Sequence, residues 1–303
     1  MNKLTILDGG MGRELKRMGA PFSQPLWSAQ ALIESPEIVT LAHKNFIHAG
    51  AEIIIANSYA CVPFHLGQKM YESDGARLAK EAAILAQDAV AQTEKQVRVA
   101  GALPPAFGSY RPDLFDAVEG EKIFRTLFEA QDPYVDIWLA ETISSIEEFD
   151  VIQSVLSQTP KTCYYAFSLQ DTPSNTALIR SGQSVLEATL RVCESGGHGV
   201  YFNCSVPEVM AQAIRDAKQV IDELNAEVEI GVYANNFAPI GSNHEANDTI
   251  QEMRELSPQD YLTYSKQWHQ LGATTIGGCC GIGPEHIQAL SDWKLSQHGE
   301  SQR

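Results

Sequence analysis

Short apolar runs alternate with longer amphipathic segments along nearly the whole chain. The runs are rich in Ile, Val, Leu and aromatic residues, and they are too short for helices, so we interpret them as buried strands. The segments between them carry apolar residues at helical spacing. The predicted strands cover residues 3–7, 51–56, 97–103, 135–140, 163–168, 199–202, 229–233 and 273–276. The predicted helices cover residues 36–48, 73–93, 119–131, 145–157, 184–194, 207–224, 258–270 and 284–293.

Regular repetition of a strand followed by a helix predicts an α/β fold, and a (β/α)8 TIM barrel is the architecture that eight such units form. Glycine marks two of the junctions, because Gly50 and Gly272 each end a helix directly before a strand. An open doubly wound sheet is the competing architecture, but it rarely contains eight regular units. We therefore predict a single barrel domain over residues 1–295, a long polar loop over 236–256 and a flexible tail over 296–303.

Composition narrows the class of partner. The chain has 303 residues, 44% of them hydrophobic, and a net charge of −16. Nucleic acid and anionic membranes attract basic surfaces, so neither is expected to bind, and small molecules are the expected partners. The sequence begins without a signal peptide pattern and contains no apolar run of membrane-spanning length. We expect a cytoplasmic protein whose thiols stay reduced, and no feature indicates the oligomeric state.

Two acidic residues follow predicted strands. In a (β/α)8 barrel the carboxyl ends of all strands meet at one face, where ligands bind. Asp8 follows the first strand and Glu141 follows the fourth. Gly9 and Gly10 come next after Asp8 and permit a tight turn with exposed N–H groups, although the GxGxxG and Gly-Lys-Ser/Thr patterns are missing. Either Asp8 holds a ligand's ammonium while these N–H groups hold its carboxylate, or Asp8 only forms a turn.

Three of the six cysteines are predicted to reach the same face. Cys279 and Cys280 follow the last strand between glycines, which let the backbone bend so that both thiols face one ion. Cys204 follows the sixth strand. A pair of buried apolar cysteines and a vicinal disulfide are the alternatives for the adjacent residues. We predict one zinc ion per chain at the three thiolates, with an open fourth position because no further cysteine lies at a strand end.

A zinc ion with three thiolates carries a net negative charge, which makes it a poor Lewis acid for activating water. It still deprotonates an incoming thiol, and the bound sulfur stays electron-rich. A free thiol is only a few per cent ionised at neutral pH, so coordination greatly increases the available nucleophile. Such a centre favours alkylation of a thiol by a cationic donor.

The motifs that carry these residues resemble those of the homocysteine S-methyltransferase family. They are Asp8-Gly9-Gly10-Met11-Gly12, Ala140-Glu141-Thr142, Asn203-Cys204-Ser205 and Gly277-Gly278-Cys279-Cys280-Gly281. The resemblance covers residues 4–293 and implies a zinc-dependent barrel that methylates homocysteine to methionine. It implies that Cys204, Cys279 and Cys280 are the zinc ligands and that Asp8 and Glu141 bind the amino group of homocysteine.

The resemblance also bears on the methyl donor. Leu26-Trp27-Ser28-Ala29 and Asn57-Ser58-Tyr59 are similar to the branch that uses S-methylmethionine or S-adenosylmethionine. Thr142 stands where the betaine branch has a tyrosine, which counts against betaine. The expected reaction is an in-line displacement at a sulfonium methyl group. We expect no cobalamin-binding module in this protein, which argues against methionine synthesis through a cobalamin bound to the same chain.

Polar and aromatic residues near the strand ends complete the expected substrate contacts. Trp27, Tyr59 or Tyr110 would stabilise a sulfonium by cation–π contact, with core packing as the alternative for each. Asn57 lies in the same expected donor region. Asn203 and Asn235 either orient ligands or satisfy turn backbone.

Other functions stay open at this point. Betaine as donor, or another thiol or selenol as acceptor, would keep the same chemistry. A non-catalytic zinc-binding barrel would close the site with a fourth protein ligand, for which His244 and Tyr233 are candidates. A redox barrel would instead join Cys279 and Cys280 by a reducible bond.

Overall fold

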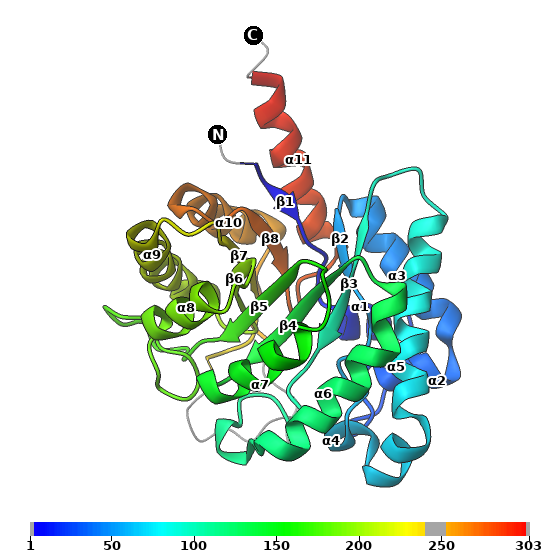
Figure 1. Ribbon diagram of the computed structural model, residues 1–303. Coiled ribbons are helices and arrows are strands. Elements are labelled where there is room, and N and C mark those ends of the chain that lie inside the picture. Colours follow the sequence, from blue (N-terminus) through cyan, green and yellow to red (C-terminus); the bar gives the residue numbers. More distant parts are fainter. Residues whose placement is uncertain (1–2, 240–252, 301–303) are drawn as a thin grey trace.

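Eight parallel strands form one sheet in the order β1-β8-β7-β6-β5-β4-β3-β2 (Figure 1). The computed structural model describes residues 3–239 and 253–300. The strands are β1 (Thr5–Ile6), β2 (Ile53–Ile55), β3 (Arg98–Leu103), β4 (Ile137–Ile143), β5 (Cys163–Ser168), β6 (Gly199–Asn203), β7 (Glu229–Ala234) and β8 (Thr275–Gly278). A parallel bridge between Leu7 and Ile53 joins β1 to β2. The sheet thereby curves into a barrel, which confirms the predicted α/β fold.

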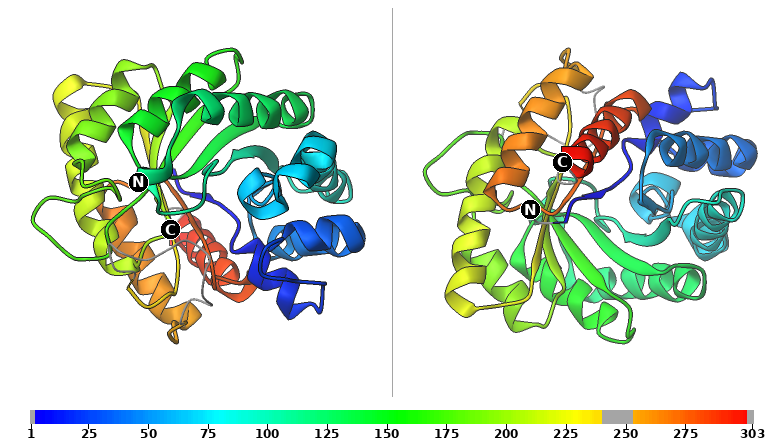
Figure 2. Two further views of the ribbon diagram at one scale, coloured as in Figure 1. Left: turned by 90° about the horizontal axis from the view of Figure 1, so that it is seen from below. Right: turned by 90° about the horizontal axis from the view of Figure 1, so that it is seen from above.

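Helices surround the barrel on its outer side (Figure 2). They are α1 (Met11–Arg17), α2 (Ala29–Glu34), α3 (Pro36–Ala49), α4 (Pro63–Leu66), α5 (Gln68–Ala91), α6 (Ala117–Gln131), α7 (Ile146–Leu156), α8 (Val185–Glu194), α9 (Pro207–Leu224), α10 (Pro258–Leu271) and α11 (Pro284–Glu300), with 3-10 turns η1 (Pro112–Leu114) and η2 (Asp132–Tyr134). Among the helices of the described residues, none combines the length and the apolar character needed to cross a membrane.

Amphipathic spacing explains how the outer helices pack. On α9 the buried positions include Val209, Ala213, Ala217 and Val220, which recur at three- and four-residue intervals on one face. Helix α5 buries a run of alanines instead, and such small side chains let a helix lie close to its neighbours. Burial of these faces between sheet and helices forms the larger of the two apolar cores.

Tyrosines fill the inside of the barrel. The rings of Tyr164 and Tyr201 stack with their centroids 4.7 Å apart. The hydroxyl of Tyr201 donates a hydrogen bond to Thr275 Oγ1 at 3.1 Å. A side chain at Gly231 would meet the Tyr201 ring at 2.6 Å, so glycine makes room for it. The barrel is therefore packed inside, as is usual for this fold, whose ligands bind at the mouth.

The structure corrects two predictions, the flexible tail and the position of Glu141 after its strand. Helix α11 continues to Glu300, so the predicted flexible tail is helical up to that residue. Strand β4 continues to Ile143, which places Glu141 inside the strand instead of after it. Most of the predicted polar loop lies outside the described residues, as does the candidate ligand His244; Phe237 and Met253 at its two ends form an antiparallel bridge.

Candidate metal centre and ligand cavity

The three predicted cysteines converge at the mouth of the barrel. The sulfur atoms of Cys204, Cys279 and Cys280 all lie within 4.8 Å of one another. Cys204 follows β6 with a backbone φ of 47°, a conformation that turns the chain sharply at the strand end. The backbone N–H of Cys279 donates to the carbonyl of Ala234 at 2.8 Å, which extends the pairing of β7 and β8 into the cysteine turn.

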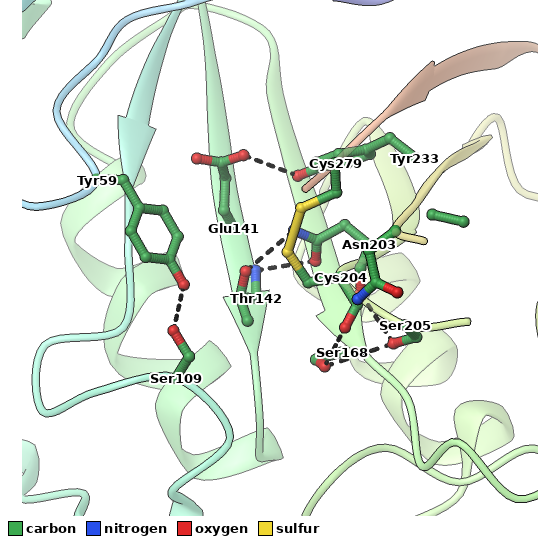
Figure 3. Close-up of a disulfide and its surroundings, with 12 residues drawn as sticks. Tyr59, Ser109, Glu141, Thr142, Ser168, Asn203, Cys204, Ser205, Tyr233 and Cys279 are labelled. Carbon is green, nitrogen blue, oxygen red and sulfur yellow. Dashed lines mark hydrogen bonds between the residues drawn. A yellow bond between two sulfur atoms is a disulfide. The ribbon is translucent and has the colours of Figure 1, made fainter. Parts of the chain in front are cut away.

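Cys204 and Cys279 are joined as a disulfide, and Cys280 is a free thiol (Figure 3). This pairing differs from the Cys279–Cys280 bond that the redox alternative requires. Metal binding needs all three sulfurs as thiolates, so the disulfide must first be reduced to thiols, which lose their protons on binding the metal. Burial raises the pKa of the Cys280 thiol to about 11, so a bound cation is needed to hold it ionised near neutral pH. Three clustered thiols fit a soft or borderline ion such as zinc.

The glycines after β1 pack directly against the cysteine turn. A Cβ atom at Gly10 would lie 2.5 Å from the carbonyl oxygen of Cys279 and 3.1 Å from the Cα of Cys280. The N–H of Gly10 donates to the carbonyl of Ile282 at 2.9 Å. This N–H is therefore occupied by the protein and is not available for the carboxylate role that the sequence suggested. Gly10 instead fixes the backbone that carries two of the three sulfurs.

A β-bulge aims Glu141 into the mouth. The register between β4 and β5 shifts between Ala140 and Ile143, and Thr142 has a positive φ of 57°. Asn203 holds this conformation: its Oδ1 accepts from Thr142 N–H and its Nδ2 donates to Thr142 Oγ1, both at 3.0 Å (Figure 3). The amide of Asn203 is thus engaged by the protein, and it positions Glu141 from the end of β6.

Glu141 and Asp8 are buried carboxyl groups that face the same cavity. Burial raises the pKa of Glu141 to about 7, while a hydrogen bond from Tyr233 opposes the shift. Burial also holds the pKa of Asp8 well above its usual range, with a contribution from the charge of Glu141. Asp8 Oδ2 accepts the N–H of Ile55 at 2.8 Å, whereas the buried Oδ1 has no partner among the described residues. An ammonium between the two carboxylates would supply the missing donor and lower both pKa values.

The cavity is lined by most of the predicted site residues. The cavity has a volume of about 160 Å³. The predicted residues that line it are Asp8, Gly9, Gly10, Trp27, Asn57, Tyr59, Glu141, Cys204, Cys279 and Cys280. Asn203 and Asn235 are outside this lining, because Asn203 bonds Thr142 and Asn235 bonds the backbone of Phe237 and Ser205.

Aromatic side chains form the outer wall of the cavity. Phe22 and Trp27 meet edge to face with centroids 5.3 Å apart. The Tyr59 hydroxyl lies 2.5 Å from Ser109 Oγ. Tyr110 has a positive φ of 66°, and the guanidinium carbon of Arg180 lies 4.5 Å from its ring centroid. These rings provide faces that attract a cation, as expected for a sulfonium.

The lining residues that were not selected from the sequence include Arg13, Phe22, His65 and Ser109. Phe22 lies between α1 and α2, and His65 lies on the short helix α4. Burial lowers the pKa of His65 to about 4, so its imidazole is neutral at pH 7. Arg13 lies in the first turn of α1, five residues after Asp8, and no pattern in the sequence marked it.

A (β/α)8 barrel with a cysteine cluster and two buried carboxyl groups at its mouth has the architecture of a class of methyltransferases. The model of the homocysteine S-methyltransferase family matches residues 5–293, and the chain belongs to that family of methyltransferases. It is 28% identical to homocysteine S-methyltransferase of Escherichia coli over 95% of this chain and 94% of that protein. It is 26% identical to homocysteine S-methyltransferase YbgG of Bacillus subtilis, over 97% and 95% of the two chains.

Solved structures show the same fold. The metallated form of the homocysteine methyltransferase MmuM from Escherichia coli superposes with a TM-score of 0.78 and 24% identity over 96% of each chain. Its oxidized form superposes with the same TM-score of 0.78. These similarities support the barrel architecture over its full length.

Proposed function

We propose that the protein transfers a methyl group from a sulfonium donor, S-methylmethionine or S-adenosylmethionine, to the sulfur of homocysteine, giving methionine. One zinc ion per chain at Cys204, Cys279 and Cys280 is part of this proposal. The observation that carries it is the convergence of three thiols and two buried carboxyl groups on one cavity. When bound, zinc would keep an incoming thiol ionised at neutral pH and hold it at the open fourth position.

The chain's own residues would orient the acceptor. Asp8 Oδ1, which has no partner among the described residues, and Glu141 would bind the ammonium of homocysteine. Tyr233 donates to Glu141 Oε1 and keeps that carboxylate directed across the mouth. With the ammonium and the sulfur both held, the acceptor has few remaining orientations, which favours a near-attack geometry.

The reaction balances without a general acid. The acceptor's thiol proton is lost to solvent, its sulfur electron pair forms the new S–C bond, and the donor's S–C bond breaks with its electrons staying on the donor sulfur. The donor leaves as a neutral thioether, so no proton is needed on the leaving group. Trp27, Tyr59 and Tyr110 present ring faces that would stabilise the sulfonium before transfer. A reducing compartment such as the cytoplasm would keep the cysteines as thiols.

The test combines metal analysis with product formation. Protein purified under reductant without chelator is analysed for bound metal, then given homocysteine with S-methylmethionine, S-adenosylmethionine or betaine, and methionine is quantified. Selenocysteine serves as a second acceptor, because a curated relative, selenocysteine methyltransferase of Astragalus bisulcatus, is 24% identical. About one zinc per chain and turnover on a sulfonium donor are expected. Turnover on betaine alone would contradict the proposed donor, and reduced protein free of zinc would contradict the metal centre.

A further inference from the structure

Arg13 is a positive charge in a cavity that is otherwise acidic. It lies on α1 and is half-buried, and its side chain lines the same cavity as Asp8, Glu141 and the cysteines. Among the described lining residues it is the only lysine or arginine, and the one lining histidine, His65, is neutral. The guanidinium forms no hydrogen bond or ion pair with the described residues. By contrast, Arg17 on the same helix is paired with the buried carboxylate of Glu14.

Arginine is suited to bind a carboxylate because its planar donors match both oxygens. A half-buried guanidinium without a protein partner loses hydration that an anionic ligand can replace. The substrates of the proposed reaction supply such a group, since homocysteine and amino-acid sulfonium donors each carry an α-carboxylate. Fewer backbone N–H groups than expected are available to bind this carboxylate, because the N–H of Gly10 already donates to the carbonyl of Ile282.

We propose that Arg13 is the carboxylate-binding residue of the cavity and that it selects substrates with an α-carboxylate. This inference rests on the proposed methyl transfer between amino acids. Asp8 and Glu141 would bind the ammonium of a substrate while Arg13 binds a carboxylate, so that the cavity recognises a zwitterion from both ends. The carboxylate belongs either to the acceptor or to the donor, and the two sources are separated by experiment.

The experiment measures binding of matched ligand pairs by calorimetry to reduced, zinc-loaded protein. The acceptor pair is homocysteine and 3-aminopropanethiol, which is homocysteine without its carboxylate. The donor pair is S-methylmethionine and 3-aminopropyl(dimethyl)sulfonium, which lacks the carboxylate in the same way. Each pair is measured on the unmodified protein, on Arg13→Gln and on Arg77→Gln. Arg77 is an exposed residue of α5 outside the cavity, so it controls for the loss of one positive charge.

In one of the two pairs, the unmodified protein and Arg77→Gln should bind the carboxylate ligand about 10- to 100-fold more tightly than its partner. Arg13→Gln should lose that preference, and Arg13→Lys should recover part of it. The pair in which the preference disappears identifies the substrate that Arg13 holds. An unchanged preference in both pairs, or none in the unmodified protein, would overturn the inference.

A second measurement separates this role from a purely electrostatic one. If Arg13 served only as counter-charge to the thiolates, Arg13→Gln would lose zinc while the carboxylate preference persisted, which would also overturn the inference. Methionine formation is followed in parallel. Selective binding without methionine formation would refute the proposed function but support the role of Arg13. Methionine formation that is unchanged in Arg13→Gln would support the proposed function but refute the role of Arg13.

Discussion

The Tyr233 hydroxyl donates a hydrogen bond of 3.3 Å to Glu141 Oε1, linking β7 to β4 across the mouth of the barrel (Figure 3). In the free protein this bond offsets only part of the effect of burial, because the pKa of Glu141 stays raised to about 7. The carboxyl group is therefore half protonated near neutral pH, and it can bind an ammonium only when it is ionised. Ligand affinity and protein stability should depend on pH in opposite ways.

Methionine binding should tighten about tenfold from pH 6 to pH 8, because the ionised fraction of Glu141 rises across that range. Methionine is the preferred probe, since it has no thiol that titrates. Calorimetry at a series of pH values measures the effect. In Glu141→Gln the affinity should be low and less dependent on pH, and the dependence that remains contains the contribution of Asp8, whose pKa burial also raises. A dependence as steep as that of the unmodified protein would assign the titration to another group.

The free energy of unfolding should fall as pH rises from about 4.5 to about 7. In that interval native Glu141 keeps a proton that the unfolded chain has already lost, so higher pH favours unfolding. Glu148 lowers the free energy of unfolding as pH rises over the same range, because burial raises its pKa to about 7 as well. It lies on α7 outside the cavity. Denaturant titrations at several pH values should give a smaller slope with pH for Glu141→Gln, and the slope that remains contains the contribution of Glu148.

Gly10→Ala should release the metal, whereas Gly12→Ala should not. A Cβ at Gly10 would lie 2.5 Å from Cys279 O, so the backbone carrying Cys279 and Cys280 has to move. A Cβ at Gly12 meets Phe22 at an ordinary 3.9 Å. Zinc affinity measured by competition with a chelator should fall at least about tenfold in the first variant, because displaced ligands lose metal affinity on the scale of 10- to 100-fold. Equal zinc affinities in Gly10→Ala and Gly12→Ala would refute close packing between the turn after β1 and the cysteine turn after β8.

Removing one thiol of the centre should abolish zinc retention and activity together. Cys279→Ala tests this, and Cys193→Ala is the matched control, since Cys193 is a half-buried free cysteine outside the cavity.

Glu141→Ala should keep zinc but raise the homocysteine concentration required, because it removes an ammonium contact worth about 1.5–3 kcal/mol. Metal analysis and steady-state kinetics on reduced proteins distinguish the two effects. Zinc loss in Glu141→Ala would mean that this residue supports the metal.

Arg180→Met should destabilise the protein by about 3 kcal/mol, because it removes the guanidinium that forms a buried ion pair with Asp171 at 3.2 Å. It should also lower kcat/KM for the donor, since Arg180 stacks on Tyr110 in the cavity wall. Arg191→Met removes an exposed pair with Asp150 and should cost less than about 1 kcal/mol. Denaturant midpoints and donor kinetics measure both effects. An unchanged donor KM and kcat would show that Tyr110 keeps its place without Arg180.

The sequence was sufficient to predict which residues lie at strand ends. Cys204, Cys279 and Cys280 could be placed together because a closed parallel barrel brings every strand end to one face. The direction of Glu141 could not be predicted in the same way. It depends on the bulge at Thr142, a β-branched residue with positive φ, and on Asn203, a partner far along the chain. Such a conformation is stabilised by tertiary contacts and leaves no local pattern.

Arg13 shows a related limit. That its guanidinium lines the cavity without a hydrogen-bond partner among the described residues is a property of the folded structure, which no sequence pattern marks. The opposite holds for Gly10, whose exposed N–H looked free in the sequence and is bound to Ile282. Hydrogen-bond partners distant in sequence are the part of the site that pattern analysis cannot assign.

Asp8 also takes part in closing the barrel. Between β1 and β2 the bridge of Leu7 and Ile53 is short, and Asp8 Oδ2 accepts the N–H of Ile55 in the direction in which a strand ladder would continue. The same carboxyl group thus fastens the joint between the first and second strands and offers its other oxygen to the cavity. A ligand ammonium at that oxygen would change the charge of the carboxyl group that Ile55 donates to, so the Ile55 amide is a position at which binding could be followed by NMR.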